Sequence, residues 1–300
     1  MKMKPKLVSI IIPSRSDRFL QKTVSELLNK ARGDIEIIVV LDGYWPKVMV
    51  EDDQRVTVIH HGGQHKNYGM RASINTGVSV SKGEFIMKTD EHCAFDEGFD
   101  VKLVADCEDN WLVTPRRFRL DDENWAASIG RENPPIDNMF LTCPIKGDLG
   151  LNGKEWRQWR RQRKHILIDD CLTMQGSCYF MTRKHWDWLG GLDDERYGAF
   201  HFEPQEIVFK TWLGGGRVVV NKKTWYAHRH RGPGEGRKYG FCNKQTSEME
   251  GSRQAINKSG AEYWVNNCWA ERKHDFEWLI NKFWPIPEWP DNWKELIKEK

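Results

Sequence analysis

The chain has 300 residues and a mass of 35.2 kDa, with 39% hydrophobic and 30% charged residues, a composition typical of a soluble globular protein. The net charge of +3 is too small by itself to indicate a nucleic-acid-binding protein. No apolar run approaches the ~20 residues that span a bilayer, so the sequence predicts no membrane span.

The number and spacing of the cysteines indicate whether the protein resides in a reducing or an oxidising compartment. There are seven, an odd number, and no two of them form a Cys-x-x-Cys pair. Such a set indicates reduced thiols in a reducing compartment, not a disulfide framework or a structural zinc site. We therefore expect a cytoplasmic location, in the host cytoplasm if the protein is viral.

The first 90 residues alternate between apolar runs and segments with helical periodicity. Leu7–Ile12 is an almost unbroken apolar run ending at Pro13, as expected for a strand covered on both faces. The predicted order is strand Leu7–Ile12, helix Asp17–Ala31, strand Ile35–Leu41, strand Arg55–His60, helix Tyr68–Val80 and strand Glu84–Lys88. Strand–helix alternation with short connections predicts a doubly wound α/β sheet.

The alternation of apolar strands and amphipathic helices becomes less regular after about Asp100. We predict, in order, helix Val101–Asp106, strand Trp111–Thr114, a loop-rich stretch over 120–155, strand Leu172–Met181, helices Lys184–Leu189 and Gln205–Leu213, and strand Arg217–Val220. Trp225–His228 is expected to lead into a loop. The tryptophan- and proline-rich residues 271–300 are expected to form a helical and extended strap packed on the domain.

Polar residues follow the strand predicted at Glu84–Lys88. Asp90 and His92 are two residues apart at its end, and strand side chains at i and i+2 point to the same face. Because open α/β sheets bind ligands at the carboxyl ends of their strands, this carboxylate and imidazole form a candidate divalent-cation site that would neutralise a nucleotide diphosphate. The plainer alternative is a solvated turn.

Several motifs occur in a familiar order. They are Ser9-Ile10-Ile11-Ile12-Pro13-Ser14, Ile38-Val39-Val40-Leu41-Asp42, Thr89-Asp90-Glu91-His92-Cys93, Thr173-Met174-Gln175-Gly176-Ser177, Gly190-Gly191-Leu192-Asp193, Glu203-Pro204-Gln205-Glu206, Ala227-His228 and Ala261-Glu262-Tyr263-Trp264. Over residues 5–270 this series resembles nucleotide-sugar glycosyltransferases of the GT-A fold. It is most similar to the catalytic domain of the polypeptide N-acetylgalactosaminyltransferases, whose metal motif is Asp-x-His.

The resemblance implies an α/β fold of GT-A type, a Rossmann-like sheet flanked by helices with a C-terminal strap. Residues 1–270 would form the catalytic domain, with a nucleotide-binding half over 1–100 and an acceptor half over 101–270. The implied activity is transfer of a sugar from a UDP-sugar donor to a hydroxyl acceptor, assisted by a metal ion.

The same resemblance implies roles for individual residues. Asp90, His92 and His228 would hold Mn²⁺ or Mg²⁺, although His228 taken alone reads as a surface-loop histidine. The implied nucleotide-binding residues are Pro13, Ser14, Arg15, Asp42, Arg71 and Asp90. The plainer alternatives are a turn residue for Asp42 and a solvated helix residue for Arg71.

Two acidic residues are the candidates on the acceptor side, Glu203 and Glu206. Inverting relatives carry Asp at the position of Pro204, and retaining relatives carry Asn. The departure from the inverting pattern favours transfer with retention of configuration. Both glutamates also fit a helix start, where acidic side chains are favourable.

A basic, aromatic stretch over residues 156–165 bears on the acceptor. Trp156, Trp159, Arg160 and Arg163 would share one helical face, and arginine with tryptophan suits phosphate contact and base stacking. This suggests DNA carrying 5-hydroxymethylpyrimidines, as in phage-type DNA, and the plainer alternative is a solvated cationic helix. A nucleotidyltransferase and a non-catalytic nucleic-acid-binding module are rivals from other classes. The lack of a glycine-rich phosphate loop after the first strand disfavours the nucleotidyltransferase.

Overall fold

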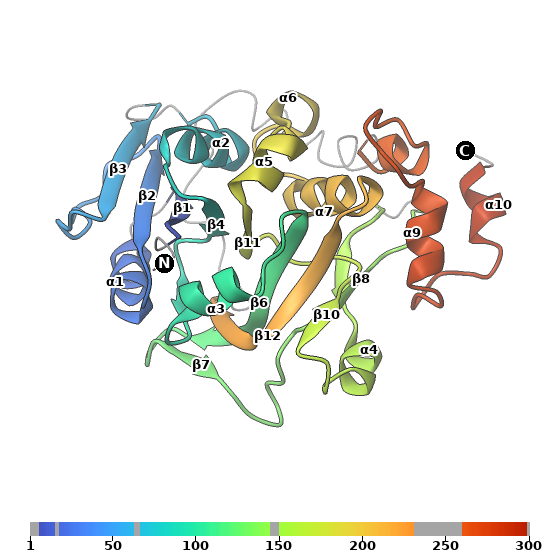
Figure 1. Ribbon diagram of the computed structural model, residues 1–300, viewed down its shortest axis with the longest axis horizontal. Coiled ribbons are helices and arrows are strands. Elements are labelled where there is room, and N and C mark those ends of the chain that lie inside the picture. Colours follow the sequence, from blue (N-terminus) through green and yellow to red (C-terminus); the bar gives the residue numbers. More distant parts are fainter. Residues whose placement is uncertain (1–5, 16–17, 63–66, 145–149, 231–259, 299–300) are drawn as a thin grey trace, which may run out of the picture.

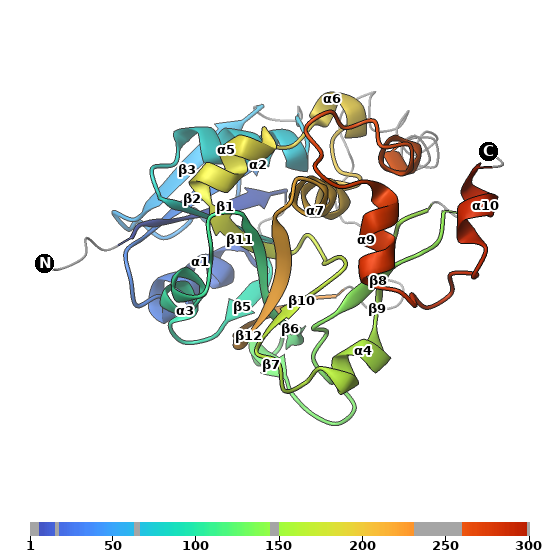
Figure 2. The ribbon, with the colours of Figure 1, turned by 45° about the vertical axis from the view of Figure 1, so that its right-hand side comes forward.

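A computed structural model describes residues 6–15, 18–62, 67–144, 150–230 and 260–298. Ten strands of this described part form one sheet, in the order β10-β12-β6-β11-β4-β1-β2-β3, while β5 pairs with β12 and β7 with β6. Helices cover both faces of the sheet (Figures 1 and 2). No helix in these ranges is long and apolar enough to cross a membrane.

The N-terminal half follows the predicted alternation closely. Its elements are β1 (Val8–Ser14), α1 (Leu20–Lys30), β2 (Ile35–Asp42), β3 (Val56–His61), α2 (Met70–Val80) and β4 (Phe85–Thr89). These four strands are parallel, with β1 between β2 and β4. β1, β2 and β4 are buried along nearly their whole length, which explains their continuous apolar sequence.

The C-terminal half contains more strand than expected. Its elements are β5 (Cys93–Phe95), α3 (Phe99–Ala105), β6 (Trp111–Asp121), β7 (Ala126–Ser128), β8 (Met139–Leu141), β9 (Gly153–Glu155), α4 (Arg157–Gln162), β10 (Ile168–Asp170), β11 (Cys178–Thr182), α5 (Arg183–Leu189), α6 (Asp194–Tyr197), α7 (Glu203–Leu213) and β12 (Arg217–His228). β11 runs antiparallel to β4 and β6, so the sheet is mixed rather than purely parallel.

Two predictions for strands in this half were wrong. The strand expected at Leu172–Met181 is confined to Cys178–Thr182, and the strand expected at Arg217–Val220 continues to His228. The register of β12 against β6 shifts between Asn221 and Trp225, and its later residues then pair with β6 and β5. This irregularity interrupts the apolar pattern by which a strand is recognised.

The core lies in two layers, one on each face of the sheet. One layer packs α2, α5, α7 and the C-terminal segment against residues such as Ile11 and Ile86, and the other packs α1 and α3 against Ile10 and Ile12. The C-terminal segment contains α9 (Phe276–Lys282), which lies beside α7, and α10 (Trp293–Lys298) at the opposite end of the molecule from β3 (Figure 2).

Tryptophans attach this segment to the rest of the chain. Trp264, Trp269, Trp289 and Trp293 belong to the core layer of α7, and the Trp289 indole donates a hydrogen bond of 2.6 Å to the carbonyl of Leu141. Much of the high tryptophan content therefore serves packing.

Candidate active site

A cavity of about 320 Å³ opens at the carboxyl ends of β1, β2 and β4 and at the end of β12. It is lined by seven of the predicted site residues, namely Pro13, Ser14, Arg15, Asp42, Asp90, His92 and His228. The three others, Arg71, Glu203 and Glu206, do not line it. The strand ends therefore gather most of the predicted site into one place, as expected for an open α/β sheet.

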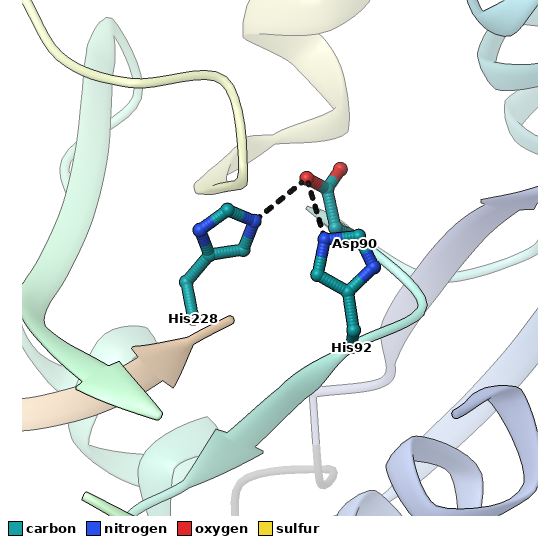
Figure 3. A group of neighbouring side chains, drawn as sticks. All are labelled: Asp90, His92 and His228. Carbon is teal, nitrogen blue, oxygen red and sulfur yellow. Dashed lines mark hydrogen bonds and ion pairs between the residues drawn. The ribbon is translucent and has the colours of Figure 1, made fainter. Parts of the chain in front are cut away.

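Asp90, His92 and His228 form a compact cluster at this cavity (Figure 3). The Asp90 Oδ2 atom lies 3.2 Å from His228 Nε2 and 4.0 Å from His92 Nε2. One ligand atom from each residue lies within 4.8 Å of the others. This is the group that the Asp-x-His motif and Ala227-His228 predicted.

Strand pairing brings the three residues together. Asp90 follows β4 and donates its N–H to the Ser177 carbonyl at 2.9 Å. β12 pairs antiparallel with β5, with His228 opposite Cys93, and the Arg229 N–H donates to the His92 carbonyl at 3.2 Å. The site thus depends on β5 and on the far end of β12, neither of which was predicted as strand.

Burial and charge set the protonation of the cluster. Burial opposes ionisation of Asp90, but the charge of Lys88 and the hydrogen bond to His228 outweigh it and hold the pKa of Asp90 well below its usual range. Burial lowers the pKa of His92 to about 4 and also lowers the pKa of His228. At neutral pH the cluster therefore offers one carboxylate and two neutral imidazoles.

Asp42 braces one wall of the cavity. Its carboxylate accepts the N–H groups of Tyr68 at 2.7 Å and Gly69 at 2.9 Å, and its carbonyl accepts a hydrogen bond from the Arg15 guanidinium. Gly69 has a φ of +99°, and a Cβ there would lie 2.3 Å from the Cβ of Ala199, so only glycine fits. Asp42 thus shapes the cavity wall.

Ser14 is also held within the wall. Its hydroxyl lies 2.5 Å from the Tyr44 hydroxyl and donates a hydrogen bond to the Glu91 carboxylate. Glu91 lines the cavity and is buried. The end of β1 is therefore fixed to the Asp-x-His loop.

Arg71 and Glu206 are placed differently from the expectation. Both side chains are fully buried and form an ion pair with each other, while the Arg71 guanidinium also donates to the His201 carbonyl and lies over the Tyr197 ring. The ion pair joins α2 to α7 because the inward face of α2 meets the first turn of α7. In this arrangement neither residue reaches the cavity.

Glu203 lies immediately behind the cavity wall. A Cβ on Gly176 would lie 2.1 Å from Glu203 Oε2, so the carboxylate packs directly on that glycine, next to the cavity-lining Gln175. Glu203 is 2% exposed, and burial raises its pKa. Its Oε1 has no hydrogen-bond partner in the part of the chain that the structure describes.

The basic stretch is only partly available to an acceptor. Trp156 is buried and stacks on Trp159 at 4.6 Å, and Arg163 lies over Trp159 and pairs with Asp169. The shared helical face exists, but Trp156 is buried and Trp159 is half-buried against the core, so little of either ring is exposed for base stacking. The other cations of the stretch are Arg157, which pairs with Glu155, and Arg160, Arg161 and Lys164.

Residues 9–188, which include β1, β2, β4 and the Asp-x-His loop, match the model of glycosyl transferase family 2. The chain belongs to this family. This membership agrees with the glycosyltransferase resemblance that the motif series carried.

Two curated relatives agree with the assignment. The uncharacterized glycosyltransferase EpsJ of Bacillus subtilis (strain 168) is 32% identical over 113 residues, which are 35% of this chain and 32% of EpsJ. The putative polypeptide N-acetylgalactosaminyltransferase 13 of Drosophila melanogaster is 23% identical over 241 residues, which are 71% of this chain and 40% of that protein. The chain spans 32% and 40% of the lengths of these two relatives.

The fold comparison points the same way. The crystal structure of GalNAc-T7 with UDP, GalNAc and Mn²⁺ matches with a TM-score of 0.64 at 15% identity, covering 93% of this chain and 57% of that chain. The predicted GT-A-type α/β fold of this family 2 glycosyltransferase is thus confirmed.

Several residues near the cluster were not predicted, among them Gln175, Phe200, His230 and Lys88. Gln175, Phe200 and His230 line the cavity, and Lys88 contacts Asp90. Lys88 had a sequence signal, since it precedes Asp90 by two residues on the same strand face. Gln175 and Phe200 lie outside regular elements, where no periodicity indicates which side chains face a site.

Proposed function

We propose that this glycosyltransferase moves a sugar from a UDP-sugar to a hydroxyl acceptor with the help of a divalent metal ion. The observation that carries the proposal is the Asp90, His92 and His228 cluster, which lies in the cavity lined by Ser14 and Asp42. The cavity thus combines a cation site with the strand ends where an open α/β sheet binds nucleotides.

The donor atoms fit Mn²⁺. Ligands about 2.1 Å from one ion lie roughly 3 to 4 Å apart, and the Asp90 oxygen lies 3.2 Å and 4.0 Å from the two imidazole nitrogens. A set of two imidazoles and one carboxylate suits a borderline ion better than Mg²⁺, which prefers oxygen ligands. When bound, the ion would neutralise the charge of the departing diphosphate.

The remaining residues of the cavity would bind and orient the donor. Asp42 and Ser14 hold the wall against which the nucleoside would lie. Phe200, 39% exposed, offers an aromatic face, and Gln175 offers an amide for the sugar hydroxyls. The enclosed walls would limit access of water to the donor and so favour transfer over hydrolysis.

We further propose retention of configuration. Inversion requires a general base that takes the proton of the acceptor, a role that an acidic pair fills in inverting relatives. Among the described residues lining the cavity the carboxylates are Asp42, Asp90 and Glu91, which accept hydrogen bonds from backbone amides, Lys88 and Ser14 respectively. Glu203 lies behind Gly176. None of the four is placed as a base aimed at an incoming hydroxyl.

The candidate acceptor is a polyanion. Arg160, Arg161 and Lys164 supply positive charge that suits a polyanion such as hydroxymethylated DNA. The expected result for Arg160→Gln with Arg161→Gln is weaker binding of such DNA, measured by filter binding at two salt concentrations, with unchanged UDP binding. Equal DNA binding by the double variant and the unaltered protein would rule out this role of the stretch.

The donor site is tested by calorimetric titration of UDP with and without Mn²⁺. We expect Mn²⁺-dependent binding that is lost in Asp90→Asn and kept in Asp109→Asn, an exposed carboxylate on another part of the surface. NMR of the sugar product then reports the configuration of the anomeric carbon. Folded protein that binds no UDP under any metal condition would exclude a UDP-sugar donor.

A further inference from the structure

Lys88 is a buried cation in direct contact with the metal-binding carboxylate. Its ammonium lies 2.5 Å from Asp90 Oδ1 and 2.6 Å from the Gly176 carbonyl, and its side chain is 1% exposed. Lys88 lies in β4 between β1 and β11, opposite Ile11 and Tyr179, on the sheet face that packs against α7. A charge at such a position is tolerated only when it is paired.

Because of this contact, the two carboxylate oxygens of Asp90 have different partners. Oδ1 accepts from Lys88, whereas Oδ2 faces the imidazoles of His228 and His92. Asp90 would therefore give a metal ion one oxygen and not two. Because Lys88 holds Oδ1 from within the sheet, the direction of Oδ2 is fixed before any ion arrives.

The same contact offsets the charge of the metal-binding carboxylate. Lys88 and Asp90 form an ion pair in which the positive charge of the ammonium lies against the negative charge of the carboxylate. Affinity for a divalent cation rises with the negative charge of its ligands, and an ammonium a few ångströms away repels the ion. Taken together, this ion pair and the two imidazoles attract a bare cation weakly.

Nucleotide diphosphate supplies the negative charge that these four residues lack. Its oxygens complete the shell of the ion, and its charge is attracted to the cationic side of the site, where Arg15 and Arg229 also line the cavity. The two ligands should therefore bind with strong mutual coupling.

We propose that Lys88 is a positioning residue that makes metal binding depend on the nucleotide, by neutralising Asp90 and presenting only its Oδ2 atom to the ion. This inference rests on the proposed function, since it takes the cluster as the metal site and a nucleoside diphosphate as its partner. It assigns to Lys88 control over the strength of the coupling between metal and nucleotide.

The first test uses the unaltered protein. The Mn²⁺ affinity is measured from the EPR signal of aqueous Mn²⁺, without and with saturating UDP, and corrected for Mn²⁺ held by UDP in the absence of protein. We expect UDP to raise the affinity of the protein for Mn²⁺ by at least about tenfold, within the usual range of coupling between two ligands. Equal affinity with and without UDP would overturn the proposal.

The second test changes Lys88. Lys88→Gln keeps an N–H donor for Asp90 and Gly176 but removes the charge, and Lys88→Arg keeps the charge. Without UDP we expect Lys88→Gln to bind Mn²⁺ roughly tenfold more tightly than the unaltered protein and to lose most of the coupling to UDP. We expect Lys88→Arg to retain most of that coupling.

A matched control is available in Lys222. It is also buried, and its ammonium pairs with Asp169 at 3.1 Å without contacting the metal cluster. Lys222→Gln should leave Mn²⁺ affinity unchanged. Circular dichroism verifies folding of each variant. If Lys88→Gln does not fold, Lys88→Met, which also removes the charge, takes its place, and retention of the full coupling in that variant would overturn the proposal.

The outcomes separate this inference from the proposed function. Mn²⁺-dependent UDP binding together with unchanged or weaker Mn²⁺ affinity in Lys88→Gln would overturn the role of Lys88 and leave the glycosyl-transfer proposal standing. An unaltered protein that binds neither Mn²⁺ nor UDP would overturn both.

Discussion

The Oδ2 atom of Asp90 lies 3.2 Å from Nε2 of His228, although the two residues are 138 positions apart in the sequence. The contact exists because β12 runs beside β5 and ends where the Asp-x-His loop begins. The candidate metal site thus joins the loop after β4 to the end of β12.

His228→Ala tests this junction. Loss of one of three protein ligands should reduce Mn²⁺-dependent turnover and UDP binding by roughly 100-fold or more, since even residues that only orient a ligand are worth about 10–100-fold. The matched control is His60→Ala, a histidine of β3 that stacks on Trp45 away from the cavity. Equal UDP binding by His228→Ala and the unaltered protein would remove His228 from the metal site.

Gly176→Ala tests the close packing behind the cavity. A Cβ there would lie 2.1 Å from the Glu203 carboxylate, so we expect the free energy of unfolding to fall by about 1–3 kcal/mol in urea denaturation. Gly130→Ala is the control, because a Cβ there has no atom within 4 Å, and its effect should stay within about 0.5 kcal/mol. Similar stabilities for the two variants would show that Glu203 is not held against Gly176.

Arg71→Met distinguishes a structural role from a nucleotide contact. Removing one partner of a buried ion pair typically costs about 3–5 kcal/mol of stability, and Glu206 would keep only Lys210 as a cation. UDP affinity of the folded variant should change little, because Arg71 does not line the cavity. A stable variant with much weaker UDP binding would restore the original expectation of a nucleotide contact.

His185 predicts a pH dependence of stability away from the metal site. Burial lowers its pKa to about 4, and its Nε2 lies 3.0 Å from the Thr211 hydroxyl. In the unfolded chain the pKa is about 6.5, so between pH 6.5 and 4 the unfolded state binds more protons and stability falls as pH falls. The loss attributable to His185 is at most about 3 kcal/mol.

His185→Gln should remove this part of the dependence, measured by urea denaturation at pH 7.5 and pH 5. His165→Gln, at an exposed position, should show the same change in the free energy of unfolding with pH as the unaltered protein. If His185→Gln also shows the same change as the unaltered protein, His185 takes up its proton equally in the folded and unfolded states.

Local sequence was sufficient for the first half of the sheet. β1, β2 and β4 are covered on both faces, so their sequences are continuous apolar runs that only a buried strand explains. Asp42, Asp90 and His92 follow such runs directly, and their gathering at one edge follows from parallel strand order.

Tertiary structure determined the course of β12 and the position of Arg71. β12 contains Asn221 and Lys222, which are tolerated in the sheet because Asp106 and Asp169 pair with them across the fold. Arg71 is a buried anchor instead of a cavity residue because Glu206 lies opposite it, and the sequence holds no sign of that meeting.

There is a physical reason why local sequence determined some features of the fold and tertiary structure determined the others. Periodic burial is set within a few neighbouring residues and is therefore written in the local pattern of apolar side chains. The partner of a buried charge is chosen by how distant strands and helices pack, as with Asp90 and His228, so the amino-acid sequence specifies it only through the completed fold.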